Sequence, residues 1–190
     1  MINSTKKEKT IGITGASGTL GKELTKLFRQ KGHKVIGFTH SKTNYEINLE
    51  SPNEWIYWEC GKESSLKKHL EKIDILILNH GIYNLSRENA NYENSIEINA
   101  LSKFKFLNLF EDIALNNDSL IKKIILGPFK SELNPIGIMS PKFVSKKIYN
   151  LANSKKYLII ISPNPLTYLL FPIKEFLNYL YCRIIYKYKS

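Results

Sequence analysis

Short apolar runs alternate along the chain with stretches in which apolar residues recur every three to four positions. The apolar runs predict strands at residues 10–14, 34–38, 55–58, 73–78, 121–126 and 157–161. The periodic stretches predict helices at 20–31, 64–72, 94–113 and 141–153. Strands that alternate with amphipathic helices favour a parallel sheet with helices on both faces, and right-handed crossovers give it a doubly wound order. We therefore predict an α/β fold with a doubly wound parallel sheet of about six strands.

A glycine-rich turn joins the first predicted strand to the first predicted helix. Residues 14–21 read Thr-Gly-Ala-Ser-Gly-Thr-Leu-Gly. Gly15 allows a tight turn, Gly18 lets the backbone approach a pyrophosphate, and Gly21 allows close packing of the helix on the strand. This pattern predicts a dinucleotide site in a Rossmann-like sheet, and a tight turn without a ligand is the alternative. The expected cofactor-binding residues of the turn are Gly15, Ser17, Gly18, Thr19, Leu20 and Gly21.

The composition is that of one globular domain. With 190 residues, of which 43% are hydrophobic, the chain is long enough to bury a core. Cys60 and Cys182 lie far apart without metal-ligand spacing, so we expect reduced thiols and no metal site. The polar first nine residues lack the apolar core of a secretory signal. We therefore expect a cytoplasmic protein.

The formal net charge of +11 is concentrated near the C-terminus. Residues 142–190 hold nine basic residues and one acidic residue, Glu175. Because no nucleic-acid motif accompanies this charge, we expect no nucleic-acid partner. Attraction to anionic lipid or to a phosphorylated cofactor explains the charge at least as well, and a general richness in lysine is a further interpretation.

The chain divides into a nucleotide-binding domain, residues 1–165, and an apolar, basic tail, residues 166–190. The tail is rich in Leu, Tyr, Phe and Ile, but Pro172, Lys174, Glu175 and Arg183 interrupt it. Because no uncharged span reaches ~18 residues, we expect no transmembrane helix. We expect a helix that packs on the sheet. The alternatives are a dimer-forming helix and an amphipathic helix that associates the protein with a membrane surface.

Three further motifs follow the glycine turn in order. Asn79-His80-Gly81 ends the predicted strand 73–78, and Asn99 lies within Ile-Glu-Ile-Asn-Ala at residues 96–100. A proline-glycine-like loop follows a late strand, either at Gly127-Pro128 or at residues 162–165. In order and spacing these motifs resemble the short-chain dehydrogenase/reductase family, whose members are NAD(P)-binding proteins with a Rossmann fold. The glycine spacing is similar to that of the extended or atypical branch.

The resemblance implies a site, partners and an activity. Family members interconvert carbonyls and alcohols with NAD or NADP, and they form dimers or tetramers through helices beside the sheet. By resemblance, Asn79, His80 and Gly81 flank the adenosine, and Gly127 and Pro128 flank the nicotinamide. Asn99 matches the asparagine that holds a water in the proton relay. The implied partners are the dinucleotide, an unidentified small-molecule substrate and further copies of the chain. The alternatives for His80 and Asn99 are a strand cap and a helix kink.

The end of the second predicted strand bears on the choice of cofactor. An NAD enzyme usually places a carboxylate there to hold the ribose hydroxyls. This chain has Thr39, His40, Ser41 and Lys42 and no carboxylate. Hydroxyls and a lysine suit the 2′-phosphate of NADP, so we favour NADP over NAD. The alternative is an ordinary polar loop.

The family's catalytic residues are not all present. The family uses Ser, Tyr and Lys, with Tyr and Lys four residues apart on one helix, but this chain holds no Tyr-x-x-x-Lys. In one alignment, 121–126 is the family's fifth strand and Ile138 replaces the tyrosine, four residues before Lys142. In the other, 124–129 is the strand and loop that normally follow the active helix. A strand and that helix are then missing between roughly residues 113 and 121. The second alignment explains more of the sequence.

The activity stays open in either alignment. Loss of a positioned general acid costs ~10²–10⁴ in rate, and the amide of Asn99 cannot replace it because it does not titrate usefully. We expect an NAD(P)-binding oxidoreductase by descent. The alternatives are a non-catalytic NAD(P)-binding or sensing module and a peripheral membrane protein. Residues 127–139 also resemble the substrate-side loop of a subgroup associated with sterol desaturases.

Overall fold

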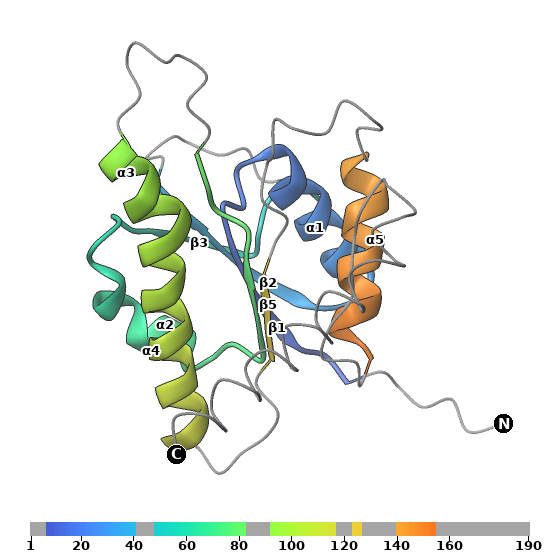
Figure 1. Ribbon diagram of the computed structural model, residues 1–190. Helices are drawn as coiled ribbons and strands as arrows, with labels where there is room; N and C mark the ends of the chain where they lie inside the picture. Colours follow the sequence, from blue (N-terminus) through green and yellow to red (C-terminus); the bar gives the residue numbers. More distant parts are fainter. Residues whose placement is uncertain (1–6, 41–47, 83–91, 117–122, 127–139, 155–190) are drawn as a thin grey trace, which may run out of the picture.

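The structure is a computed structural model that describes residues 7–40, 48–82, 92–116, 123–126 and 140–154. These residues form a parallel sheet between two layers of helices (Figure 1). The sheet that they build has five strands in the order β3-β2-β1-β4-β5. The strands are β1 Thr10–Thr14, β2 Lys34–Thr39, β3 Glu54–Tyr57, β4 Ile75–Leu78 and β5 Lys123–Leu126.

The central strands are apolar because helices cover both faces of the sheet. Strand β1 pairs in parallel with β2 on one side and with β4 on the other. All of β4 is buried, and so are the last four residues of β1. A strand that is buried on both faces forms a continuous apolar run instead of an alternating pattern. This burial explains why the sequence marks these strands clearly.

Two helices cover one face of the sheet, α1 (Thr19–Gln30) and α5 (Pro141–Ala152). In Figure 1 they lie together on one side of the strands. Phe28 of α1 and Ile148 of α5 join Ile11 of β1 in one core cluster. Helices bury their apolar stripe against another element, and this shared cluster holds α1 and α5 on the same face of the sheet as Ile11.

The opposite face is covered by the segments that precede and follow β4. They are a 3₁₀ turn Glu63–Leu66, α2 Lys67–Leu70, α3 Tyr92–Ile96, a π-helical turn Glu97–Leu101 and α4 Ser102–Asn116. Phe106 and Phe110 of α4 pack with Trp58, Ile36 and Leu76 in a second core cluster. The sheet lies between the two clusters, and the α4 cluster reaches the loop after β3.

The structure confirms the α/β parallel sheet with helices on both faces. The five strands expected before residue 127 are present to within two residues at each end. The helix expected at 94–113 is divided by a π-helical turn, and the one at 64–72 is a 3₁₀ turn followed by α2. The predicted strand 157–161 lies outside the described residues. Within the described ranges, no helix is long and apolar enough to cross a membrane.

Candidate functional site

The candidate site lies at the carboxyl end of β1, where the strand order reverses. From β1 the chain crosses to β2 on one side, and it later returns to place β4 on the other side. Loops that leave β1 and β4 therefore diverge and open a crevice, which is where parallel α/β sheets bind their ligands. The glycine turn leaves β1 at this point, and Asn79 and His80 follow β4 directly.

The glycine turn has the shape that its sequence predicts. Gly15 has a φ of +65°, which is in the left-handed region, and its N–H donates to the carbonyl oxygen of Phe38 at 3.0 Å. A Cβ at Gly21 would lie 2.2 Å from the carbonyl oxygen of Gly15 and 2.6 Å from the Cα of Ala16. Only glycine therefore fits at position 21, and the helix starts directly against the turn.

The start of α1 leaves backbone donors for an anion. Gly18 is the N-cap in extended conformation, and no side chain caps the helix. The first intrahelical bond runs from the N–H of Lys22 to the carbonyl oxygen of Gly18 at 2.9 Å. The N–H groups of Thr19, Leu20 and Gly21 precede that bond, so the helix itself cannot satisfy them. Such donors, together with the helix dipole, form an anion-binding site.

Thr14 joins the glycine turn to the loop after β4. Its buried hydroxyl oxygen accepts the N–H groups of Asn79 at 2.9 Å and His80 at 3.2 Å. The same oxygen lies 2.7 Å from Nδ1 of the His80 ring. Sequence reasoning missed the role of Thr14, although its position at the strand end is a signal that could have identified it. This hydroxyl fixes the spacing of the two loops that border the crevice.

His80 is buried and electrically neutral. Its side chain packs against Trp58 and Phe106 at ring-centroid distances of 5.2 and 5.7 Å. Burial lowers the pKa of His80 to about 3, with Lys103 and His40 adding to the effect and a backbone group of Ile98 opposing it. Because the ring is uncharged at neutral pH, the Thr14 hydroxyl can donate to Nδ1. His80 therefore positions the loop and does not exchange protons near pH 7.

Asn99 lies in the π-helical turn and is bound to the loop after β4. Its Oδ1 accepts the N–H of Ile82 at 2.9 Å, and its Nδ2 donates to the carbonyl oxygen of Ile82 at 2.9 Å. A Cβ at Gly81 would lie 2.8 Å from this Oδ1, so glycine is needed for the approach. Interruptions of this kind in a helix often mark functional sites. Here the asparagine side chain holds the backbone, and its role in a proton relay stays a prediction.

Thr39 ends β2 and His40 follows it, and both are candidates for the ribose side of the cofactor. Thr39 is buried, and its hydroxyl lies 3.3 Å from that of Ser17 in the glycine turn. His40 turns toward the loop after β3, where its Nδ1 lies 2.9 Å from the carbonyl oxygen of Trp58. Its ring centroid lies 4.1 Å from that of the indole, with 45° between the ring planes. The structure thus places Thr39 beside the turn and His40 against Trp58. Ser41, Lys42, Gly127 and Pro128 lie outside the described residues.

A buried carboxylate supports the border between the loop after β3 and α4. Glu63 accepts the Gly61 N–H at 3.0 Å and the Ser102 hydroxyl at 2.8 Å. Burial is the main cause that raises the pKa of the neighbouring Cys60 thiol, and Glu63 adds to it. The thiol therefore stays protonated and unreactive near neutral pH. Sequence reasoning missed Glu63, because a glutamate at a helix start is usually exposed.

Tyr57 and Tyr149 are not placed to replace the family's acid. Tyr57 is exposed on the edge strand β3, and Tyr149 packs against Phe28 on the α1 and α5 face. The described residues also contain no group of three or more His, Cys, Asp or Glu side chains suited to a metal ion. The start of α1 offers backbone donors for an anion, and Thr14, His80 and Asn99 hold the backbone of the loop after β4.

The location of α5 bears on the two alignments. Strand β5 lies on the outer side of β4, and α4, which connects them, lies on the face opposite α1. A right-handed crossover from β5 to a further outer strand would place its helix on the α4 face as well. Helix α5 instead packs on α1 (Figure 1). It therefore does not occupy the position of a helix that connects the fifth and sixth strands.

Comparison with known proteins gives one family and one curated relative. The model of the NAD dependent epimerase/dehydratase family matches residues 11–118. The monoglucosyldiacylglycerol epimerase of Synechocystis sp. is 30% identical over 230 residues, which cover 95% of this chain and 56% of that protein. The chain thus spans about half the length of this relative. Because 230 exceeds the chain's 190 residues by 40, the aligned region contains at least 40 positions without a counterpart here.

Two solved structures share the fold over most of the chain. A short chain dehydrogenase from Burkholderia cenocepacia in complex with NADP has a TM-score of 0.66 at 12% identity, with 93% of this chain and 97% of that chain covered. The serine dehydrogenase of Escherichia coli has a TM-score of 0.60 at 15% identity, with 80% and 94% covered. At these identities the likeness concerns the fold.

The match from residue 11 to residue 118 includes the glycine turn, the strands on both sides of the crevice and Asn99. It covers more than half of the chain. The association with the subgroup of sterol desaturases, expected from residues 127–139, stays a prediction. From the matched region and the Rossmann-like sheet together, we conclude that this protein belongs to the NAD dependent epimerase/dehydratase family.

Proposed function

We propose that the protein binds a nicotinamide dinucleotide in the crevice between the glycine turn and the loop after β4. The observation that carries this proposal is the turn itself. Gly15 adopts a left-handed conformation, Gly21 admits no side chain, and α1 starts without a side-chain cap. The pyrophosphate would bind at the backbone donors of Thr19 and Leu20. When bound, the dinucleotide supplies a hydride donor or acceptor.

We also propose that NADP is preferred over NAD. Thr39 stands where an NAD enzyme usually has a carboxylate, and its hydroxyl approaches Ser17 of the turn. No carboxylate there repels a 2′-phosphate, and Lys42 follows three residues later. His40 contributes less than its sequence position suggests, because its ring contacts Trp58.

Replacing Thr39 by aspartate tests this preference. The new carboxylate would repel a 2′-phosphate and accept the ribose hydroxyls of NAD, so we expect Thr39→Asp to weaken NADPH binding more than tenfold and to leave NADH binding equal or stronger. The affinities are measured by calorimetric titration, and Thr39→Ser serves as the control because it keeps the hydroxyl. A parallel loss of both cofactors would contradict the proposed preference and indicate general damage to the site.

We further propose that the chain has lost most of the family's catalytic power. The location of α5 on the α1 face supports the alignment in which a strand and the Ser/Tyr/Lys helix are missing. The relative's extra aligned positions support it too. His80 and Asn99 do not replace the acid, because His80 is neutral and the Asn99 side chain is engaged with Ile82. A binding or sensing role is therefore favoured over rapid turnover.

Assays of NADPH oxidation distinguish a binding or sensing role from rapid turnover. We expect NADPH to bind. We expect its oxidation by simple carbonyls to be ~10²–10⁴-fold slower than in a family member that has the Ser/Tyr/Lys residues. Because the curated relative is an epimerase of a glucosyl lipid, the substrate panel should include glucosyldiacylglycerol as well as simple ketones. Turnover at rates of several per second on any of them would show that another group supplies the acid.

A further inference from the structure

The outer surface of α5 combines lysines with an exposed aromatic ring. Lys142 and Lys146 are exposed, Lys147 is half-buried, and the helix contains no acidic residue. Phe143 is 45% exposed, and the Nζ of Lys147 lies 5.4 Å from the centroid of its ring. No ion pair between described residues involves these three lysines.

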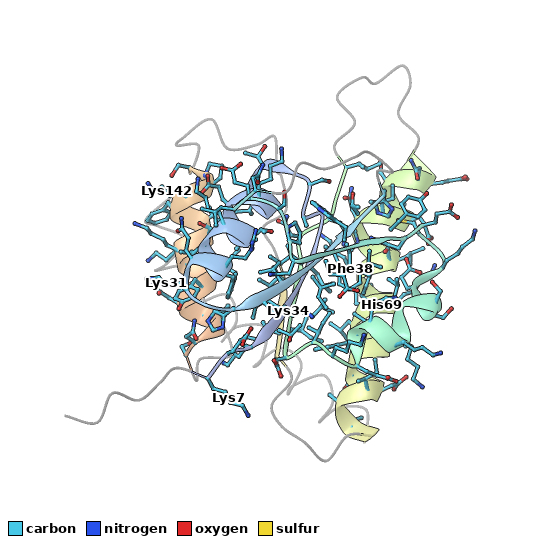
Figure 2. All side chains as sticks on the ribbon, turned by 180° about the vertical axis from the view of Figure 1, so that it is seen from behind. Lys7, Lys31, Lys34, Phe38, His69 and Lys142 are labelled. Carbon is cyan, nitrogen blue, oxygen red and sulfur yellow. The ribbon has the colours of Figure 1, made fainter. Side chains whose placement is uncertain are left out.

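The basic surface continues across a shallow hollow between α5 and α1. The hollow has a volume of about 240 Å³ and is bordered by Lys142 and Lys146 of α5 and by Lys26 of α1. Lys26 pairs with Glu50 at 3.0 Å, and Glu23 also borders the hollow, so the uncompensated charge is on the α5 side. Seen from behind in Figure 2, Lys142 and Lys31 lie on this side of the sheet and His69 lies on the opposite side.

We propose that the outer face of α5 docks on the anionic headgroups of a membrane surface. Lysines attract acidic lipid, and a ring flanked by them can enter the boundary between headgroups and acyl chains. Phe143 has Lys142 beside it, with Lys146 and Lys147 three and four residues later, so the ring and the charges share one side of the helix. The inner face of α5 is held by the core, so only this side can meet lipid.

A lipid surface fits these observations better than a nucleic acid. Binding to phosphate backbones needs charge alone, and an exposed phenyl ring adds to it only by stacking on unpaired bases. The Nζ of Lys147 lies over the ring of Phe143, and 45% of the phenylalanine stays exposed to solvent. At a lipid surface the ring can leave water while the lysines beside it stay among the headgroups. This docking surface does not depend on the dinucleotide site.

Vesicle co-sedimentation of the full chain tests the proposal. We expect binding to vesicles that contain 30% phosphatidylserine and little binding to pure phosphatidylcholine. The triple variant Lys142→Glu, Lys146→Glu and Lys147→Glu should reduce the binding constant more than tenfold, and Phe143→Ser should reduce it several-fold. The matched control is Phe104→Ser, which removes an exposed ring, 64% exposed, from α4. Thermal unfolding verifies that all variants fold.

Several outcomes would overturn the proposal. Undiminished binding of the triple variant would do so, and so would equal binding to neutral vesicles. A loss caused instead by Arg183→Glu, Lys187→Glu and Lys189→Glu would assign the contact to the tail. If a short DNA duplex bound through the same lysines and Phe143→Ser had no effect on either ligand, the surface would be a polyanion site and not a lipid site. The expected pattern, with both α5 variants impaired and Phe104→Ser unchanged, supports it.

Discussion

Replacing Gly21 by alanine is expected to abolish dinucleotide binding and to destabilise the fold. The added methyl group would lie 2.2 Å from the carbonyl oxygen of Gly15 and 2.6 Å from the Cα of Ala16, both in the backbone of the turn. Since the backbone cannot yield as a side chain can, the helix must move away from the turn. We expect a cost of about 2–4 kcal/mol in the free energy of unfolding and a loss of more than ~100-fold in affinity. Urea unfolding and calorimetric titration measure the two effects.

Gly18→Ala is the matched control for this prediction. Gly18 has an ordinary extended conformation, and a Cβ there would meet only the carbonyl oxygen of Gly15 at 3.4 Å. We therefore expect the free energy of unfolding to change little. The methyl group would still occupy the space through which a pyrophosphate approaches the backbone, so affinity should fall. A stable Gly18→Ala variant with unchanged affinity would mean that the dinucleotide binds elsewhere.

The second large effect is a loss of stability in acid that His80 causes. The pKa of His80 is about 3 in the fold, against 6.5 when exposed, because the ring is buried. Between these values the unfolded chain binds the proton and the folded chain does not, so the free energy of unfolding falls as the pH falls. The contribution is fully present above pH 6.5 and is lost progressively toward pH 3. It amounts to roughly 5 kcal/mol.

Denaturant unfolding between pH 7 and pH 4 measures this contribution, with His80→Asn as the comparison. Asparagine keeps an acceptor for the Thr14 hydroxyl but does not titrate, so the variant should lose less stability over that range. Other groups titrate equally in both proteins, and the difference between the two curves isolates the imidazole. If the free energy of unfolding depended on pH in the same way in both proteins, the pKa of His80 would not be lowered in the fold.

The strands and helices could be predicted from the sequence because the spacing of apolar residues differs between the two kinds of element. Strands such as β4, buried throughout, form uninterrupted apolar runs, and α5 carries its cap at Ser140 and a proline in its first turn. The glycine turn could also be predicted. Gly15 has a left-handed conformation and position 21 has no room for a side chain, so glycine is the residue that fits at both positions. These are local constraints, and local sequence carries them.

The remainder of the site depends on contacts between distant segments. The helix expected at 94–113 is interrupted by a π-helical turn. In this turn Asn99 binds the backbone of Ile82, 17 residues earlier, and periodicity does not report such a pair. His40 is a candidate for the ribose by sequence, and its ring contacts Trp58 in the loop after β3, which periodicity does not report. The burial of His80 likewise follows from Phe106 and Trp58, which come from other elements.

The choice between the two alignments shows the same limit. Sequence alone admits a replaced tyrosine or a missing helix, because the apolar run at 121–126 fits either the family's fifth strand or the strand that follows the active helix. The structure adds the face on which α5 packs, and the handedness of crossovers gives that face a meaning. A segment's position in the sheet, which depends on the whole fold, thus supports one of the two interpretations that periodicity leaves open.

The measurement that most directly tests the central claim is calorimetric titration of the purified protein with NADPH and with NADH. The glycine turn, the uncapped start of α1 and Thr39 at the end of β2 predict micromolar binding of NADPH and weaker binding of NADH. That result would establish the crevice as a dinucleotide site whatever the rate of turnover. Absence of heat with either cofactor, for protein shown to be folded, would contradict the claim and leave the turn as a structural feature of the fold.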